Sequence, residues 1–463
     1  MMYLMSFGYA MLLAGIWLNE RRRTESSGPD LLSLLLVIFF IQIVIPGICM
    51  TAIIAVRGGA PVTDNPFFDH VYSKLSPLEP AITLVCSAWW ALSLYAGWLI
   101  AHEIMKTRLG HEPPPKPLSC SPWRWTIVML IGLAGMWKLL NLLGGSLFES
   151  YQKLILFRAD YDEIEKTFLS ANLFASAQTF SLISIIGLFI YEKHRFRKLK
   201  MLFVLSCMII FGLMCASRRA FAIQTILIYF VYVLMNRRWY FFRFVVPLSA
   251  LFFPVIVFGK EFLSRIAVVD LNNMNYSDII EKDFFTSFMT GMSYLGISLV
   301  SSWGTLLYLD IPFRFGVDHL LSIAQRIPVG FMLGWDKSWL PERITRISTE
   351  RFLGAFDQDV PPGFIGQMWL DLGYLGPIVW GLVFGLQIGF AQLFFKRFVR
   401  TYEVTVLFVL LLFVIALPLN TGSFDFTFSV DIFLLFILLA FIYWKPTPNY
   451  ADTKFETDSH FSG

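Results

Sequence analysis

Residues 191–243 read YEKHRFRKLKMLFVLSCMIIFGLMCASRRAFAIQTILIYFVYVLMNRRWYFFR, and this stretch decides the fold class. Two continuously apolar segments, 201–216 and 220–235, lie between the basic loops 191–200 and 236–243. Continuous apolar runs of this kind predict membrane-spanning helices, because the strands of a membrane barrel would alternate apolar and polar residues. Short loops rich in Lys and Arg predict the cytoplasmic side of the membrane.

The composition of the whole chain also indicates a membrane protein. Of its 463 residues, 56% are hydrophobic and 15% are charged, and the mean hydropathy is +0.63. A soluble globular chain carries about 25% charged residues. These values exclude a water-soluble enzyme, a nucleic-acid-binding module and a disordered scaffold. The five cysteines form no CxxC pair and predict no disulfide framework.

Eleven segments are apolar and long enough, or nearly long enough, to span a membrane. They are 1–19, 31–56, 81–101, 125–143, 169–190, 201–216, 220–235, 244–258, 374–395, 402–419 and 429–444. We therefore expect an all-α polytopic membrane protein with about 11 transmembrane helices, in a range of roughly 10 to 13, and one large outer, periplasmic loop domain. The predicted divisions are an N-terminal transmembrane bundle at 1–258, the periplasmic loop domain at 259–373, C-terminal transmembrane helices at 374–444 and a cytoplasmic tail at 445–463.

The distribution of Lys and Arg predicts the orientation in the membrane. If the three arginines at 21–23 are cytoplasmic, the alternation of spans places four further basic loops on the same side: 102–124, 191–200, 236–243 and 396–400. The arginines at 21–23, these four loops and the C-terminal tail together hold more than half of the 37 Lys and Arg residues. The N-terminus is then periplasmic and the C-terminus cytoplasmic.

The long segment 259–373 contains either no crossing or two, because basic cytoplasmic loops fix the spans on both sides of it. Residues 284–309 are apolar but rich in Gly, Ser and Thr. We interpret them as a helix that dips into the bundle or lies against it. Two crossings, with 320–335 as the second, are the alternative.

Basic residues on the outer side run against the positive-inside rule, and Arg218 and Arg219 are the clearest case. Two adjacent guanidinium groups at a membrane boundary cost free energy, since one Arg at the centre of a span costs about 2.5–3.5 kcal/mol. They either reach towards phospholipid headgroups or form an anion site that faces a cavity. Arg suits an anion site because its planar fork binds phosphate oxygens through two hydrogen bonds and stays charged.

Two further groups of outer arginines have both a functional and a structural interpretation. Arg158 follows the apolar run LILF and precedes four acidic residues. It either faces a cavity at lipid level or belongs to an exposed helix held by ion pairs. Arg343, Arg346 and Arg351 lie in LPERITRISTERF, where Arg343 and Arg346 share one helical face. Neighbouring glutamates would pair with them in a solvated helix, which is the alternative to a phosphate site.

His319 follows Asp318 within the predicted outer domain. This histidine is either a catalytic base or phosphate contact, or a structural hydrogen-bonding residue. The chain contains no HExxH or Walker pattern, and its histidines are scattered. We therefore expect no metal and no cofactor, with phosphate bound by arginines.

The segment PPGFIGQMWLDLGYLGPIVWGLVFG (361–385) ends the long outer segment and enters the following span. Its glycines Gly366, Gly373 and Gly376 allow either close backbone passage or approach by a ligand. The segment resembles the PG-x-x-G…(N/D)-x-G-x-x-G stretch of the Wzy-type polymerases of bacterial O-antigen and exopolysaccharide repeat units. Asp371 stands where Asn is common in that family. The stretch ASRRAF, which follows a predicted span, resembles the outer arginine segment of the same family.

The resemblance implies a membrane-embedded glycosyltransferase of the bacterial inner membrane. It would transfer a glycan from an undecaprenyl-pyrophosphate-linked donor to an undecaprenyl-pyrophosphate-linked acceptor, with a chain-length-regulating co-polymerase as a candidate partner and no role for nucleic acid. Asp371 or His319 would orient or deprotonate the acceptor hydroxyl, and both Arg218 and Arg219 match the family's arginine segment. The residues predicted to bind pyrophosphate are Arg158, Arg218, Arg219, Arg343 and Arg351.

Two other functions fit part of the sequence. An O-antigen ligase, which transfers polymer to lipid A-core, shares the membrane architecture and the outer loop. A polysaccharide flippase or permease would also use cationic residues, but near the bilayer midplane on broken helices and often within internal repeats. This sequence shows outer cations and no repeat of roughly 20–50 residues.

Overall fold

A computed structural model describes residues 2–24, 31–57, 63, 66–109, 122–143, 146, 149–150, 153–154, 284–307, 313–318, 320–321, 344–353 and 360–398. This part of the chain is helical and contains no strand. Four of its helices are long and apolar enough to cross a membrane: Leu31–Ala52, Leu78–Ile104, Trp123–Leu143 and Leu375–Leu393. These helices indicate a membrane protein.

The four helices coincide with the predicted spans at 31–56, 81–101, 125–143 and 374–395. The predicted span 1–19 forms a helix, α1 (Met2–Thr24), but α1 is not one of the four. Its hydropathy is lowered by Ser6, Tyr9 and the polar turn at 19–24. The remaining predicted spans lie outside the described residues: 169–190, 201–216, 220–235, 244–258, 402–419 and 429–444.

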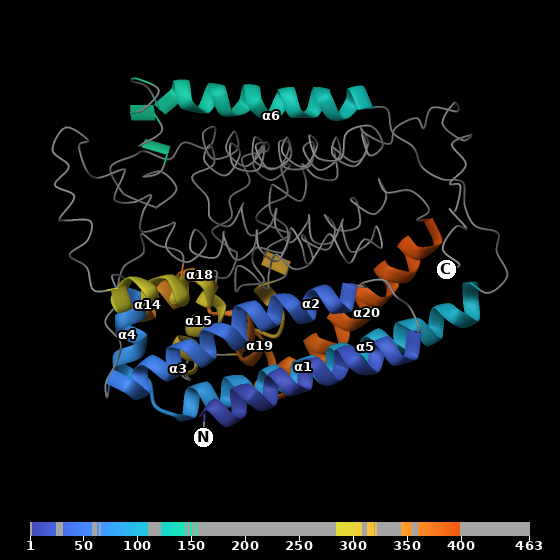
Figure 1. Cartoon of the computed structure of the whole chain (residues 1–463), viewed down its shortest axis with the longest axis horizontal. Coiled ribbons are helices and arrows are strands. Elements are labelled where there is room, and N and C mark those ends of the chain that lie inside the picture. Colours follow the sequence, from blue (N-terminus) through green and yellow to red (C-terminus); the bar gives the residue numbers. More distant parts are fainter. Residues whose placement is uncertain are drawn as a thin grey trace, which may run out of the picture.

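One bundle contains α1, a long helix at residues 31–57, α5 (Leu78–Leu109) and α20 (Leu375–Phe398) (Figure 1). The long helix consists of α2 (Leu31–Phe39), the π-helical turn η1 (Phe40–Val44) and α3 (Ile45–Arg57). Gly381 packs on Trp90, and Gly389 packs on Ala101. Residue numbers therefore increase in the same direction along both helices, which shows that α5 and α20 are parallel. α6 (Pro122–Leu143) is set apart from these helices (Figure 1).

The close contact between α5 and α20 depends on glycines. Gly381, Gly385 and Gly389 recur every four residues and share one face of α20. A Cβ atom at Gly381 would lie 2.6 Å from the Trp90 carbonyl oxygen, and one at Gly389 would lie 2.5 Å from the Ala101 Cβ. Small residues at this spacing allow two membrane helices to approach until their backbones touch.

The helix at 31–57 widens into a π-helical turn just before Pro46. Proline lacks the N–H that would bond to the Gln42 carbonyl, so the regular α-helical pattern cannot continue there. Gly296 packs against the same point, since a Cβ on it would lie 2.6 Å from the Pro46 Cβ. Gly296 also separates α14 (Phe284–Leu295) from α15 (Ile297–Leu307). The segment predicted as one helix at 284–309 is therefore two helices.

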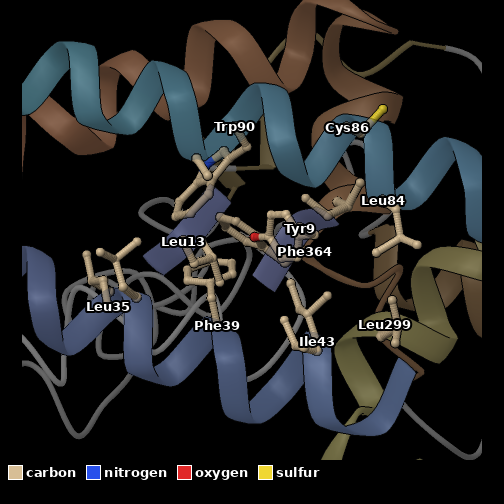
Figure 2. Packing of buried hydrophobic residues seen from close by; sticks show 14 of the residues in the cluster. Tyr9, Leu13, Leu35, Phe39, Ile43, Leu84, Cys86, Trp90, Leu299 and Phe364 are labelled. Atoms are coloured by element: carbon tan, nitrogen blue, oxygen red, sulfur yellow. The ribbon is translucent and has the colours of Figure 1, made fainter. Parts of the chain in front are cut away.

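α15 and α19 (Phe364–Leu372) share one hydrophobic core with α1, α2 and α5 (Figure 2). Phe364, the first residue of α19, lies with its ring centroid 5.3 Å from that of Trp90 and 6.0 Å from that of Phe39. Leu299 of α15 belongs to the same cluster. Dispersion contacts between these closely packed side chains hold α15 and α19 against the bundle.

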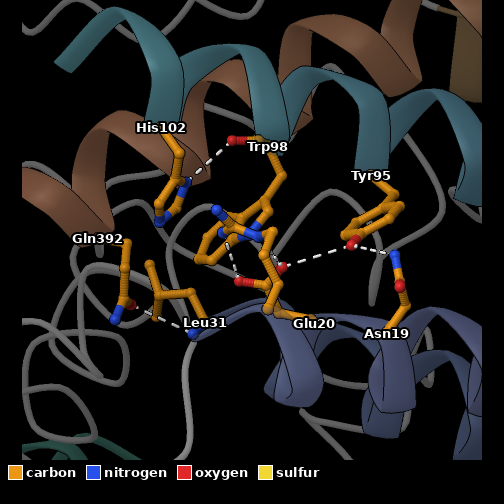
Figure 3. A network of polar contacts seen from close by, with 8 residues as sticks. Asn19, Glu20, Leu31, Tyr95, Trp98, His102 and Gln392 are labelled. Atoms are coloured by element: carbon orange, nitrogen blue, oxygen red, sulfur yellow. Dashed lines mark hydrogen bonds and ion pairs between the residues drawn. The ribbon is translucent and has the colours of Figure 1, made fainter. Parts of the chain in front are cut away.

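A polar network joins α1, α2, α5 and α20 far from α19 (Figure 3). Glu20 is 2% exposed and accepts hydrogen bonds from Arg23 Nε at 2.9 Å and Nη2 at 2.7 Å. The Tyr95 hydroxyl of α5 donates to the same carboxylate at 3.4 Å. Gln392 of α20 accepts a hydrogen bond from the N–H of Leu31, the first residue of α2, at 3.2 Å. At a rise of about 1.5 Å per residue, Gln392 lies about 26 Å along α20 from its start.

Candidate functional site

The helix α19 begins at a tight contact with α15. Gly363 has a φ of 77°, and a Cβ there would overlap the Ser298 carbonyl oxygen and the Ser302 amide nitrogen. The Ser298 hydroxyl accepts a hydrogen bond from the Phe364 N–H at 2.9 Å. The Ser302 hydroxyl accepts one from the Gly366 N–H at 3.1 Å. Because the first amides of a helix lack partners within it, these two serines fix where α19 starts.

The glycines of the 361–385 segment serve backbone packing. A Cβ at Gly366 would lie 2.9 Å from the Thr305 Cβ, and one at Gly376 would overlap the Met368 carbonyl oxygen. Gly373 has a φ of 59°, which allows the chain to turn from α19 into α20. Of the two interpretations of these glycines from the sequence, the geometry favours close backbone passage.

Asp371 lies buried in the last turn of α19 and joins three segments. Its Oδ1 accepts a hydrogen bond from the Gly316 N–H at 3.1 Å, and its Oδ2 accepts one from Trp380 Nε1 of α20 at 2.8 Å. The Phe315 N–H donates to the Asp371 carbonyl oxygen at 3.3 Å. The side chain and backbone of Asp371 therefore hold the loop at 313–318 against the junction of α19 and α20.

A second buried carboxylate, Asp318, lies on the same loop. Arg314 donates to it from Nε at 3.1 Å and from Nη2 at 2.7 Å. Gln367 Nε2 also donates to it, at 2.9 Å. Since Gln367 precedes Asp371 by one helical turn, both side chains occupy one face of α19. In the described part of the chain, no group of three or more His, Cys, Asp or Glu side chains is arranged to hold a metal ion.

Burial raises the pKa of Asp371 to about 6, and the nearby Asp318 carboxylate adds to this increase. Hydrogen bonds from the Gly316 N–H and from the side chains of Trp380 and Gln367 stabilise the carboxylate and oppose the increase in pKa. A carboxyl group of this pKa is mostly ionised at neutral pH and can accept a proton from a hydroxyl group. Each carboxylate oxygen has two lone pairs, but Asp371 is fully buried, so a hydroxyl group from a substrate would reach it only after movement of the loop at 313–318.

Of the predicted site residues, the structure describes Asp371 and Arg351. Arg351 is exposed in the last turn of α18 (Ile344–Leu353). The first residue of α18, Ile344, packs against Leu370, the neighbour of Asp371. α18 also packs on α4 (Pro66–Lys74). The other predicted site residues lie outside the described residues: Arg158, Arg218, Arg219, His319 and Arg343.

Residues that the sequence did not single out complete the surroundings of Asp371. Arg314 and Asp318 are four residues apart in RFGVD and form an ion pair at 2.7 Å, but they do so across a loop with positive φ angles at Phe315 and Gly316 and not on a helical turn. Gln367 and Trp380 carry no signal in the sequence. Their roles depend on how the loop, α19 and α20 meet in three dimensions.

Comparison with protein-family models, with curated proteins and with solved structures returns no match for this chain. The functional proposal therefore rests on the chemistry of the residues and on the resemblance carried by residues 361–385.

Proposed function

We propose that the chain is a membrane-embedded glycosyltransferase that polymerises undecaprenyl-pyrophosphate-linked repeat units into O-antigen or a related surface polysaccharide. Its topology would comprise about 11 spans in the bacterial inner membrane. The N-terminus and the segment 259–373 would lie on the periplasmic side, with α15 and α19 of that segment packed into the bundle, and the C-terminus would be cytoplasmic. No cofactor is needed, and a chain-length-regulating co-polymerase is a candidate partner.

The observation that carries this proposal is the environment of Asp371 within PPGFIGQMWLDLGYLG (361–376). Its carboxylate has a pKa of about 6 and lies just before the apolar stretch that begins at Leu375. A general base works best when its pKa lies near the operating pH, and such bases typically contribute about 10²–10⁴-fold in rate. The start of a membrane-crossing helix is also the depth at which the diphosphate of a lipid carrier meets water.

The proposed reaction assigns separate tasks to the carboxylate and the arginines. The anomeric carbon of the donor glycan loses its bond to a diphosphate oxygen and forms a bond to the acceptor hydroxyl oxygen. Asp371 takes the proton of that hydroxyl, and the lipid diphosphate leaves as an anion. Arg218 and Arg219, with Arg158 and the other predicted arginines, would stabilise the developing charge, and the loss of one such contact typically costs about 3–4 kcal/mol.

The arrangement of helices supports the relative directions of the spans in the proposed topology. α5 and α20 are parallel, as they must be if both run from the periplasmic to the cytoplasmic side. The end of α1, the start of α2 and Gln392 of α20 lie near one another (Figure 3). Such proximity is expected if the end of α1, the start of α2 and the end of α20 lie on the same side of the membrane.

Substitution of Asp371 by asparagine tests the proposal in cells that lack their own copy of the gene. Asp371→Asn should shorten or abolish the ladder of polymer lengths seen on a gel of surface glycan. The abundance of the variant in the membrane is measured alongside, because the NH₂ group of the asparagine amide would face the N–H of Gly316 or of Trp380, and only a loss of polymer at normal abundance assigns the base. Glu350→Gln is the matched control, because Glu350 is an exposed carboxylate of α18, and it should leave the ladder unchanged. A normal ladder from Asp371→Asn would exclude Asp371 as the base.

The arginine assignment has its own test in the same assay. Arg218→Ala and Arg219→Ala should each shorten the ladder if both guanidinium groups contact diphosphate. Normal long polymer from both single variants would exclude these two residues from the diphosphate site.

A further inference from the structure

We propose that Phe313, Phe315, Tyr374 and Leu375 form an interfacial membrane anchor, whose side chains lie among the headgroups and upper acyl chains of the leaflet where α20 begins. The anchor concerns contact with the bilayer. It does not depend on the glycosyltransferase reaction.

The four anchor side chains are far more exposed than large apolar residues usually are in water. Their exposed fractions are 56% for Phe313, 70% for Phe315 and 62% for both Tyr374 and Leu375. The rings of Phe313 and Phe315 have centroids 6.0 Å apart. A Cβ built on Gly373 would lie 3.6 Å from the Phe313 ring, so this aromatic pair sits beside the turn that carries Tyr374. A grouped apolar surface of this kind marks contact with a membrane or a partner.

The backbone of Phe315 adds a second, independent observation. Its φ of 51° makes it the one non-glycine residue with a positive φ in the described part of the chain. Such a conformation costs about 1–3 kcal/mol for a bulky residue. Hydrogen bonds on both sides impose it, from the Arg314 N–H to the Leu370 carbonyl oxygen at 2.8 Å and from the Gly316 N–H to Asp371. This strained loop presents a phenyl ring outwards, which is favourable only if the ring leaves water.

The length of α20 places the anchor at the edge of the hydrocarbon. The apolar stretch Leu375–Leu393 has 19 residues, and it extends for about 28 Å, whereas the hydrocarbon core is about 30 Å thick. With no length to spare, Leu375 must lie at one boundary. The loop at 313–316 is hydrogen-bonded to Leu370 and Asp371, so it lies at nearly the same depth. Aromatic side chains are enriched at this depth in membrane proteins.

Lipid is the occupant that these observations favour. The anchor continues directly into the outward surface of α20, where Val379 is 42% exposed within the apolar stretch. A surface continuous with a membrane-crossing helix contacts the same bilayer. The anchor would hold Asp371 at the level of the lipid headgroups.

Depth measurements on the full-length chain in lipid nanodiscs test the anchor. The five native cysteines are replaced by alanine, and one nitroxide label is attached at Phe315→Cys or at Tyr374→Cys. Collisions with oxygen, which concentrates in lipid, and with a water-soluble nickel chelate are then compared. Ser73→Cys, on the exposed face of α4, is the water control, and Leu92→Cys, 44% exposed in the middle of α5, is the lipid control.

Both anchor labels should give an oxygen-to-nickel ratio above that of the Ser73 label and below that of the Leu92 label, which corresponds to an immersion of about 5–10 Å. A ratio equal to the Ser73 value at both anchor positions would overturn the proposal, because the loop would then lie in water. Protection from both reagents would also overturn it, since a protein partner or a second copy would then cover the loop. If Phe315→Cys disturbs the fold, the label at Tyr374 decides between these outcomes.

Discussion

Replacement of Gly385 by alanine tests the close packing of α5 against α20 within the bundle. A Cβ at this position would overlap the Leu94 carbonyl oxygen and would lie 3.0 Å from the Gly97 Cα. Both atoms belong to the backbone of α5. No side-chain rotation can relieve the overlap, so the two helices must move apart.

The neighbouring contact shows that the two helices are equally close one turn further along α20. A Cβ at Gly389 would lie 2.5 Å from the Ala101 Cβ, which is 0.9 Å short of the 3.4 Å at which ordinary contact begins. Overpacking in a well-packed interior typically costs about 1–3 kcal/mol. Separation of the helices also weakens dispersion contacts along their whole length. We expect Gly385→Ala to lower the free energy of unfolding by about 3 kcal/mol, at the upper end of this range.

The free energy of unfolding in detergent, measured by denaturant titration of the purified protein, checks this value. Gly15→Ala on α1 is the matched control, because no atom of another segment among the described residues lies within 4 Å of a Cβ built there. Alanine is favoured over glycine inside a helix by about 0.5–1 kcal/mol, so the control should be as stable as the wild type or slightly more stable. Equal stability of Gly385→Ala and the wild type would refute the packing described for α5 and α20.

Three further predictions concern the surroundings of Asp371, each checked by unfolding of the purified protein. The pKa of Asp371 is raised from 3.8 to about 6 in the fold, so its contribution to stability is present below pH about 4 and is lost as the pH rises through about 6. Asp371→Asn should flatten the dependence of the melting temperature on pH in this window, and an unchanged slope would contradict the raised pKa. Ser298→Ala should lower the free energy of unfolding by about 1–3 kcal/mol, because it leaves the buried N–H of Phe364 without its hydrogen-bond partner. Ser301→Ala should cost little, since the Ser301 hydroxyl has no hydrogen-bond partner among the described residues, and equal losses from the two variants would exclude the capping role. Arg314→Met should cost about 3–5 kcal/mol by leaving the buried Asp318 without its cation, and the double variant with Asp318→Leu should recover most of that loss. A double variant as unstable as the single one would contradict the ion-pair explanation.

The sequence was sufficient for the spans that the structure describes at 31–56, 81–101, 125–143 and 374–395, because continuous apolarity is a local property. It was not sufficient for the break at Gly296. The sequence of 284–309 favours one apolar helix, and the break coincides with a contact between Gly296 and Pro46, which is distant in the chain. A contact of this kind cannot be read from local composition.

The site shows the same division between local and distant signals. Asp371 was predicted from its own segment, whereas Gln367 was not, since it bonds to a carboxylate 49 residues away. The glycines at 381, 385 and 389 form a GxxxGxxxG pattern that is visible in the sequence. Their partner helix α5 lies hundreds of residues earlier in the chain, so the local sequence does not identify which helix packs against these glycines.

The surface glycan of a strain from which the gene has been deleted tests the central proposal most directly. Loss of a repeat-unit polymerase predicts single repeat units attached to lipid A-core, with no ladder of longer polymers, and recovery of the ladder when the wild-type chain is supplied. Bare core without any repeat unit, or a ladder of normal length, would contradict polymerisation as the function of this chain.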